Sequence, residues 1–267
     1  MITFEGLGYF GRFGNQMFQY ASGLGISIQN HQKFGFPSEN SEIIRTGVLG
    51  YDEKCVLDEC FNLTCSRYEG TKGFRTGVDT SSEFNHEWFD IGENINIHGY
   101  FQDEKYFKHC ENLIRSEFEF NDSIKETATA ELNKLKNSSN EPLISVHVRR
   151  GDYLQLSDVH PPCSLEYYNE AFDISSVLNE GRFLVFSDDI SWCKENFKLD
   201  NIIFSEVNDS YTEMCMMTMC DHHIIANSSF SWWGAWLGHN KSKTVIAPQR
   251  WFADRTTTIQ CEEWNLI

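Results

Sequence analysis

The stretch that decides the fold is Leu143-Ile144-Ser145-Val146-His147-Val148, which leads into Arg149-Arg150-Gly151-Asp152-Tyr153. A short, mostly apolar run between a polar, proline-containing segment and a charged loop is typical of a buried β-strand. Because successive side chains of a strand point to opposite faces, we expect His147 and Arg149 on one face and Val148 on the other. The pattern therefore predicts a basic group at the carboxyl end of a buried strand.

Beyond this strand, strand and helix signals alternate to the end of the chain. Further strands are predicted at 183–186, 202–204, 223–226 and 244–247, with helices from 190, over 210–221 and from 229. Short apolar strands that alternate with helices predict a parallel, Rossmann-like sheet, whose ligands bind at the carboxyl ends of the strands. The polar segment 135–142 ends in Pro and is interpreted as the seam between two domains, at 1–140 and 141–267.

The first half of the chain opens with a short strand near 2–5 and the loop Gly8-Tyr9-Phe10-Gly11-Arg12-Phe13-Gly14-Asn15-Gln16. A helix is predicted from 15 to 29, and no element is predicted between 35 and 98. A glycine loop before a helix N-terminus favours an anion, because backbone N–H groups and the helix dipole point at it. The loop lacks the ending of a Walker loop, so a tight turn without a ligand is the alternative.

Composition limits the class of protein. The 267 residues are 40% hydrophobic and 23% charged, which is typical of a folded chain. A net charge of −17 argues against nucleic acid as a partner. No apolar run reaches the roughly 20 residues of a membrane span, and the start lacks a signal peptide, so we expect a cytoplasmic protein. The nine cysteines form no C-x-x-C pair, which favours reduced, mostly buried thiols over a zinc site.

Two further segments carry candidate binding groups. Arg149 suits a diphosphate, because a guanidinium bonds two oxygens at once, whereas Arg150 and Asp152 are expected to form an ion pair that fixes the loop. In Asn227-Ser228-Ser229-Phe230-Ser231, Ser and Asn residues are predicted to cap a helix, whose N-terminus makes a second anion site. The tryptophans at 232, 233 and 236 are interpreted as core. Glu213 could accept hydrogen bonds from guanine, with a solvated helix face as the equal alternative.

Five motifs occur in register: Gly11-Arg12-Phe13-Gly14-Asn15-Gln16, Gly99-Tyr100-Phe101-Gln102, His147-Val148-Arg149-Arg150-Gly151-Asp152, Phe186-Ser187-Asp188-Asp189 and Asn227-Ser228-Ser229-Phe230-Ser231-Trp232-Trp233-Gly234. Together they resemble the α-1,2-fucosyltransferases of glycosyltransferase family 11, over residues 8 to about 251. The resemblance implies an α/β fold of GT-B type, in which two Rossmann-like domains face a donor cleft. Residues 141–267 would bind the donor, and residues 1–140 would form the acceptor side and carry the glycine loop.

The resemblance also implies the reaction. Fucose would pass from GDP-β-L-fucose to the 2-hydroxyl of a terminal β-galactose, with inversion. Arg149 would hold the donor phosphates, and Arg149 and Asn15 are the expected catalytic residues. The other implied donor-binding residues are Arg12, Gly14, His147, Asp188, Glu213, Ser228 and Ser229. Glu213 stands where Asp is common in the family, which weakens its assignment to guanine. Asp152, Glu5 and Asn15 are the alternatives for a general base.

A metal ion is not expected. Asp188 and Asp189 form a paired carboxylate, but the chain contains no Asp-x-Asp, the motif with which many sugar transferases hold a divalent ion. Arg149, hydroxyl groups and helix dipoles would instead meet the charge of the leaving diphosphate, which predicts a reaction without metal or cofactor.

The expected partners are GDP-fucose and a β-galactoside glycan, and peripheral contact with a lipid-linked glycan is compatible with the sequence. Acceptor choice is expected to depend on 35–98 and 154–166. One alternative is fucosylation of another acceptor, in α-1,6 linkage or on protein. Another is a sugar-binding protein without enzymatic activity, in which aromatic side chains form the platform: Trp88, Phe89, Tyr100 and Phe101.

Overall fold

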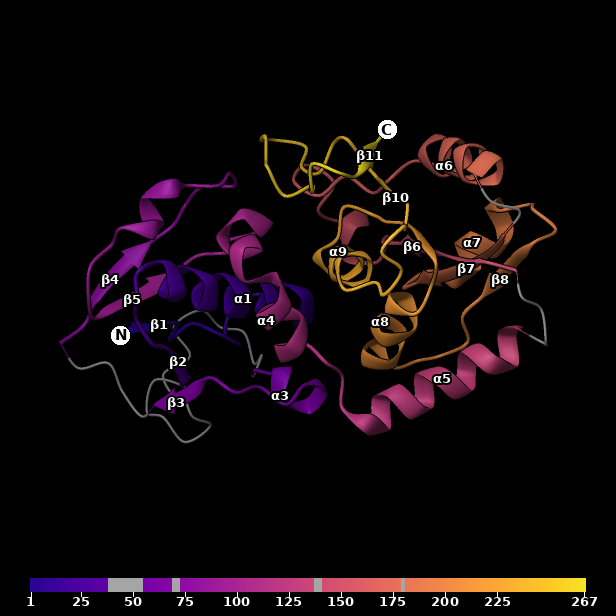
Figure 1. Ribbon diagram of the computed structural model, residues 1–267. Helices are drawn as coiled ribbons and strands as arrows, with labels where there is room; N and C mark the ends of the chain where they lie inside the picture. Colours follow the sequence, from indigo (N-terminus) through magenta and orange to yellow (C-terminus); the bar gives the residue numbers. More distant parts are fainter. Residues whose placement is uncertain (38–54, 69–72, 137–140, 179–180) are drawn as a thin grey trace. The chain divides into compact units, whose positions relative to one another are not determined.

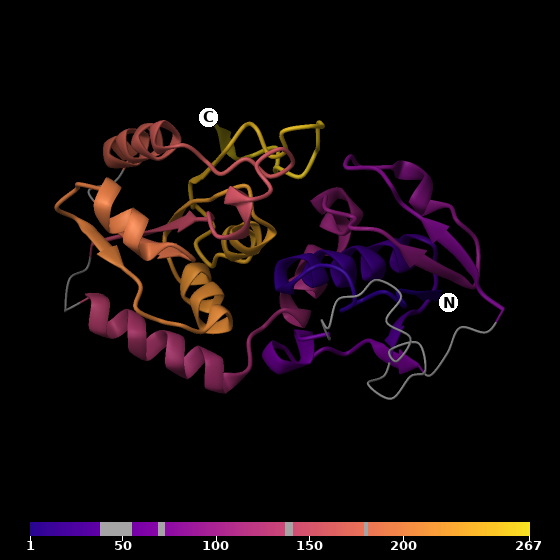
Figure 2. The same ribbon diagram turned by 180° about the vertical axis from the view of Figure 1, so that it is seen from behind.

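The computed structural model describes residues 1–37, 55–68, 73–136, 141–178 and 181–267 (Figure 1), and the chain forms two compact units. The first comprises Met1–Glu119 with Thr257–Cys261, and the second comprises Phe120–Thr256 with Glu262–Ile267. The division at Phe120 precedes the seam predicted at 135–142, because helix α5 (Asp122–Lys136) packs on α8 (Ser210–Thr218). Both views show these two helices side by side (Figure 2). Residues 137–140 of the seam lie outside the described part.

The second unit is built on a six-stranded parallel sheet in the order β11-β10-β9-β6-β7-β8. Its strands are β6 (Leu143–Val148), β7 (Arg182–Ser187), β8 (Ile202–Phe204), β9 (His222–Ile224), β10 (Val245–Ala247) and β11 (Asn265–Leu266). Counted from β6, the spatial order is the 3-2-1-4-5-6 order of a Rossmann fold. The prediction of a parallel, Rossmann-like sheet is therefore confirmed.

Helices cover both faces of this sheet. Besides α5 and α8, the helices of this unit are η4 (Asp152–Leu154), α6 (Leu165–Leu178), α7 (Ile190–Asn196) and α9 (Ser229–Trp236). The strand β6 and the starts of α7 and α9 lie where the sequence predicts them. The helix predicted over 210–221 ends earlier, at Thr218. Asp221 is instead held beside the first residue of β6, because its backbone and its carboxylate both form hydrogen bonds with the Leu143 backbone.

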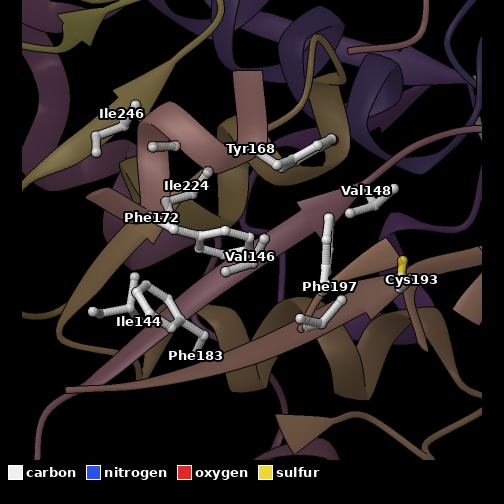
Figure 3. Close-up of a cluster of buried hydrophobic side chains, with 12 residues drawn as sticks. Ile144, Val146, Val148, Tyr168, Phe172, Phe183, Cys193, Phe197, Ile224 and Ile246 are labelled. Carbon is white, nitrogen blue, oxygen red and sulfur yellow. The ribbon is translucent and has the colours of Figure 1, made fainter. Parts of the chain in front are cut away.

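The core of the second unit follows the alternation of β6. Ile144, Val146 and Val148 are fully buried on one face, where they pack with Tyr168 and Phe172 of α6 (Figure 3). The intervening residues point to the other face, where the Ser145 hydroxyl lies 2.8 Å from Nδ1 of His223. His147 also lies on this second face, where its ring centre is 5.4 Å from that of Phe230 of α9.

The first unit contains a five-stranded parallel sheet in the order β3-β2-β1-β5-β4. Its strands are β1 (Ile2–Thr3), β2 (Phe34–Pro37), β3 (Ser66–Tyr68), β4 (Arg75–Val78) and β5 (Ile95–His98). Its helices are α1 (Phe13–Gln29), α3 (Leu57–Cys60), η1 (His86–Phe89), η2 (Glu104–Tyr106), η3 (Lys108–Cys110) and α4 (Glu111–Glu117). Most of α1 is buried, and it begins two residues before the predicted start.

Two further properties follow from the structure. None of the nine cysteines, all of which lie in the described ranges, forms a disulfide, and five of them are buried. Within the described ranges, no helix combines the length and the apolar character that crossing a bilayer requires.

Candidate active site

The candidate site of the second unit lies where the order of its strands reverses. β6 is flanked by β7 on one side and β9 on the other, and in such sheets the ligand crevice opens beyond the carboxyl ends of the strands at this point. The chain leaves β6 through Arg149 and leaves β9 toward Ser228 and Ser229. Three of the predicted donor-binding residues therefore lie at the same edge of the sheet.

Arg149 is held between two carboxylates. Its Nη1 lies 2.8 Å from Oδ2 of Asp188, and its Nη2 pairs with Oδ1 of Asp152. The guanidinium also lies 5.5 Å from the centre of the Tyr153 ring, and the side chain is 19% exposed. A planar cation fixed on two sides presents a defined edge to an anion. Asp188, predicted to bind the donor, contacts Arg149 and thus acts on the orientation of that guanidinium.

The ion pair predicted between Arg150 and Asp152 is wrong. Arg150 instead pairs with Asp189 at 3.1 Å (Nε to Oδ2), and its guanidinium lies over the Trp192 ring at 4.1 Å. Arg149 and Arg150 thus pair with adjacent aspartates of the loop that follows β7. Each of the paired carboxylates, Asp188 and Asp189, is engaged by an arginine.

His147 is buried beside the start of α9. It is 6% exposed, and its ring centre lies 5.4 Å from that of Phe230. Burial, with a smaller contribution from the Arg149 charge, lowers the pKa of His147 to about 3, so the ring is neutral at pH 7. Its Nδ1 has no hydrogen-bond partner among the described residues. His147 therefore offers an unused polar atom inside the predicted donor site.

The start of α9 differs from the prediction. Ser228 occupies the N-cap position, but its side chain makes no capping hydrogen bond, and Asn227 does not cap the helix either. Asn227 Nδ2 instead donates to the carbonyl oxygens of Pro161 and Trp251, both at 2.9 Å. The Tyr153 hydroxyl donates to the Asn227 carbonyl at 3.1 Å. Asn227 thus connects the loops around the site through hydrogen bonds.

Glu213 lies in the first turn of α8. Burial raises its pKa to about 7, a hydrogen bond with Ser205 opposes this, and the charge of Asp209 adds to it. Ser205 directly follows β8, so Glu213 faces the same carboxyl edge of the sheet as Arg149. The alternative of a solvated helix-face carboxylate does not fit this burial.

In the first unit, the glycine loop brings three predicted residues together at the start of α1. Gly11 has a φ of +91°, and a Cβ there would lie 2.6 Å from that of Asn15, so the tight turn requires glycine. Arg12 occupies the N-cap position, and Gly14 is buried in the first turn. Asn15 Oδ1 accepts a hydrogen bond from Gln102 Nε2 at 2.8 Å.

The candidates for a general base occupy different environments. Burial raises the pKa of Glu5, which follows β1 and contacts Asn96 Nδ2 at 3.3 Å. Asp152 is paired with Arg149, and Asn15 is bonded to Gln102. The role of base stays a prediction for each of the three.

Two of the four aromatic residues considered as the platform of a sugar-binding protein belong to the core. Trp88 is 8% exposed and Phe101 is 1% exposed, whereas Tyr100 is 48% exposed. The tryptophans 232, 233 and 236 are buried, as predicted. The sequence indicates no role for Tyr153 or Gln102, and for Asn227 it indicates only a helix cap. Their positions within motifs or loops were the only indication of a role in the sequence, because their hydrogen bonds link segments that are distant along the chain.

Comparisons with known proteins agree with the motifs. The family model described as "Glycosyl transferase family 11" matches residues 81–267. An Escherichia coli protein named alpha-1,2-colitosyltransferase is 30% identical over 266 residues, which span 91% of this chain and 90% of that protein. Galactoside alpha-(1,2)-fucosyltransferase 1 of Leontocebus fuscicollis is 28% identical over 251 residues, which span 85% of this chain and 63% of that protein.

Among solved structures, POFUT1 in complex with GDP is similar, with a TM-score of 0.54 and 14% identity over 92% of this chain and 97% of that chain. This likeness concerns the fold, which is α/β of GT-B type with two parallel sheets. The family match and the Escherichia coli relative cover most of the chain, and they match the elements that carry Arg149, Asp188 and Ser228. The chain therefore belongs to glycosyltransferase family 11 and is a glycosyltransferase.

Proposed function

We propose that the protein transfers L-fucose from GDP-β-L-fucose to the 2-hydroxyl of a terminal β-galactose, with inversion and without a metal ion. The observation that carries the proposal is the Arg149 guanidinium, held by Asp188 and Asp152 at the strand-order reversal of a Rossmann sheet. The relatives named for α-1,2 linkages support the same linkage here, and the GDP in the POFUT1 structure supports a guanine nucleotide donor. A cytoplasmic location stays a prediction.

The second unit supplies groups for each part of such a donor. Departure of GDP develops negative charge on the diphosphate, which Arg149 and the N-terminus of α9 would stabilise. Ionised Glu213 would accept hydrogen bonds from the guanine N–H groups, and His147 would contact the nucleoside with its unused Nδ1. The acceptor 2-hydroxyl would attack the anomeric carbon from the face opposite to GDP, which inverts that carbon.

A second donor follows from one specific comparison. The Escherichia coli relative, which matches nearly the whole chain, is named a colitosyltransferase. Colitose is therefore the second candidate for the sugar of the donor. We favour fucose on the resemblance of the motifs. Transfer in α-1,6 linkage or to protein is the alternative for the acceptor.

The test is a reaction of purified protein with GDP-fucose and lactose in the presence of EDTA, followed by GDP release and by NMR analysis of the product linkage. A parallel reaction contains GDP-colitose. Arg149→Ala should abolish turnover, and Arg150→Ala is the matched control, because Arg150 is directed toward Asp189 and Trp192. Both variants are checked for folding by circular dichroism.

A 2′-fucosylated product despite EDTA is the expected outcome. Faster transfer from GDP-colitose would identify colitose as the donor sugar. GDP release without a 2′-fucosylated product would redirect the search to other acceptors. Full activity of Arg149→Ala would overturn the assignment of the diphosphate site. Absence of both turnover and GDP binding would contradict the proposed function.

A further inference from the structure

The first unit has its own reversal of strand order. β1 is flanked by β2 on one side and β5 on the other, so a ligand crevice is expected beyond the carboxyl ends of β1 and β5. The glycine loop leaves β1, and Gly99-Tyr100-Phe101-Gln102 leaves β5. The donor assignments use the first of these two segments. No residue of the second segment is expected to bind the donor.

The backbone has a positive φ on both sides of Tyr100, and at Phe101 this conformation is strained. Gly99 has a φ of +157° and Phe101 a φ of +50°, a conformation that is costly for a bulky residue. A Cβ on Gly99 would lie 2.9 Å from the carbonyl oxygen of Asp79, so this position requires glycine. Strain of this kind persists only where the surrounding structure enforces it, and it is concentrated at functional sites.

Packing of Phe101 enforces the strain. Its ring is buried 5.0 Å from that of Trp88, and its carbonyl accepts a hydrogen bond from the Ser22 hydroxyl at 2.9 Å. Gln102 is tied to Asn15 at the same time. With its neighbours fixed inward, Tyr100 is turned outward.

Tyr100 is the only aromatic residue among the large hydrophobic side chains that are exposed in the described part of the chain. Its ring meets that of Phe10 edge to face, with centres 5.2 Å apart and planes at 73°. Phe10 also contacts His98, with ring centres 4.4 Å apart, and burial lowers the pKa of His98, which favours the neutral ring. An exposed aromatic ring beside a neutral hydrogen-bonding group suits a sugar, which has both C–H faces and hydroxyl groups.

We propose that Tyr100 is the platform on which the terminal β-galactose of the acceptor stacks. This inference rests on the proposed function and names a residue that selects its acceptor. The axial 4-hydroxyl of galactose lies on one face of the pyranose, which leaves the C–H groups at positions 3, 4 and 5 together on the other face. That apolar face packs on an aromatic ring, while the 2-hydroxyl stays at the edge of the sugar, where it can react.

The test compares Tyr100→Ala, Tyr100→Phe and Tyr100→Trp with wild type. We expect Tyr100→Ala to raise the KM for lactose on the order of tenfold, because it removes the stacking contact, and to leave the Kd for GDP-fucose unchanged. Tyr100→Phe and Tyr100→Trp should restore a KM near that of wild type, because each keeps an aromatic face. Leu113→Ala is the control for loss of an exposed apolar side chain in the same unit, and it should leave the KM unchanged.

The outcomes separate this inference from the proposed function. If wild type fucosylates lactose and Tyr100→Ala has an unchanged KM, the platform is wrong and the function stands. A loss in kcat that the aromatic variants do not rescue would show a structural role and would also overturn the platform. If wild type transfers fucose to no galactoside, both proposals fail together.

Discussion

Arg149 and Asp188 come from neighbouring strands and meet at 2.8 Å, which joins the carboxyl ends of β6 and β7 through an ion pair. Asp188 Oδ1 also accepts the backbone N–H of Arg150 at 2.9 Å. A carboxylate with these two contacts fixes both the loop and the guanidinium. Asp189, one residue on, bonds in a different direction, because it accepts the backbone N–H of Trp192 at the start of α7.

These two adjacent aspartates should give opposite results on substitution. Asp188→Asn keeps an acceptor for the Arg150 N–H but loses the charge that orients Arg149, so we expect kcat to fall about tenfold or more with little change in stability. Asp189→Ala removes the cap of α7 and should cost about 1 kcal/mol of unfolding free energy, with kcat nearly unchanged. Steady-state kinetics and urea unfolding of both variants measure this, and equal kinetic losses would contradict a separate role for Asp188.

Asp152 should compete with the donor for Arg149. The carboxylate pairs with the guanidinium in the free protein, so a diphosphate at the remaining edge of Arg149 lies close to the negative charge of Asp152. Asp152→Asn removes the competing charge, and the pair is partly exposed, so we expect GDP to bind about twofold to fivefold more tightly. Calorimetric titration with GDP at two salt concentrations tests this. Weaker binding by the variant would mean that Asp152 supports the donor site instead.

Much of the second unit could be predicted from the sequence because β6, β7 and β10 are largely buried on both faces. All six residues of β6 are buried, so a short, mostly apolar run indicated the strand and its end. In the first unit, β3 and β4 are largely exposed and carry no hydrophobic alternation, which is why no element was predicted between 35 and 98. The part of this region at 38–54 and 69–72 lies outside the described residues.

The partners of the site residues were harder to predict than their positions. The alternation of β6 placed Arg149 at the strand end, but which aspartate each arginine meets depends on how β7 lies beside β6. The sequence suggested the local pair of Arg150 and Asp152, and the distant Asp189 replaced it. The motif therefore indicated which residues carry the chemistry, whereas the contacts that orient these residues depend on the tertiary structure.

The affinity for GDP should rise with pH. The pKa of Glu213 is about 7 in the free protein, and guanine N–H groups need the ionised carboxylate as acceptor. Between pH 6 and 8 the ionised fraction rises from about one tenth to about nine tenths, so we expect up to about tenfold tighter binding at pH 8. Glu213→Gln should bind more weakly at pH 8 and lose most of this dependence. Calorimetry across this range is the measurement, and an unchanged pH profile in the variant would exclude Glu213 from the guanine site.

Acid should destabilise the fold through two buried histidines. Burial lowers the pKa of His147 and of His223 to about 3, against 6.5 for an ordinary histidine. Below pH 6.5 the unfolded chain takes up protons that the folded chain does not, so stability falls as pH falls from 6.5 toward 3. Each histidine contributes a slope of at most about 1.4 kcal/mol per pH unit. Urea unfolding from pH 7 to 4 should show a smaller slope for His223→Asn than for wild type, and equal slopes would contradict this assignment.

Asn227 should contribute to stability and to catalysis together. Its amide joins Pro161 and Trp251, which are 66 and 24 residues away, and its carbonyl holds Tyr153 beside Arg149. Asn227→Ala leaves two carbonyl groups without this donor, so we expect a loss of about 2–3 kcal/mol of unfolding free energy. Because the loop with Tyr153 and the start of α9 would both shift, kcat should fall as well.

Asn240→Ala is the matched control for the Asn227 variant. The Asn240 amide donates once, to the Asp221 carbonyl at 3.0 Å, next to the amino end of β9 and thus at the edge of the sheet opposite to Arg149. Its removal should cost about 1 kcal/mol and leave kcat unchanged. Urea unfolding and steady-state kinetics on both variants separate the two effects. If Asn227→Ala lost stability but kept the wild-type kcat under conditions where it is folded, Asn227 would support the fold alone, and the position of Tyr153 would not depend on it.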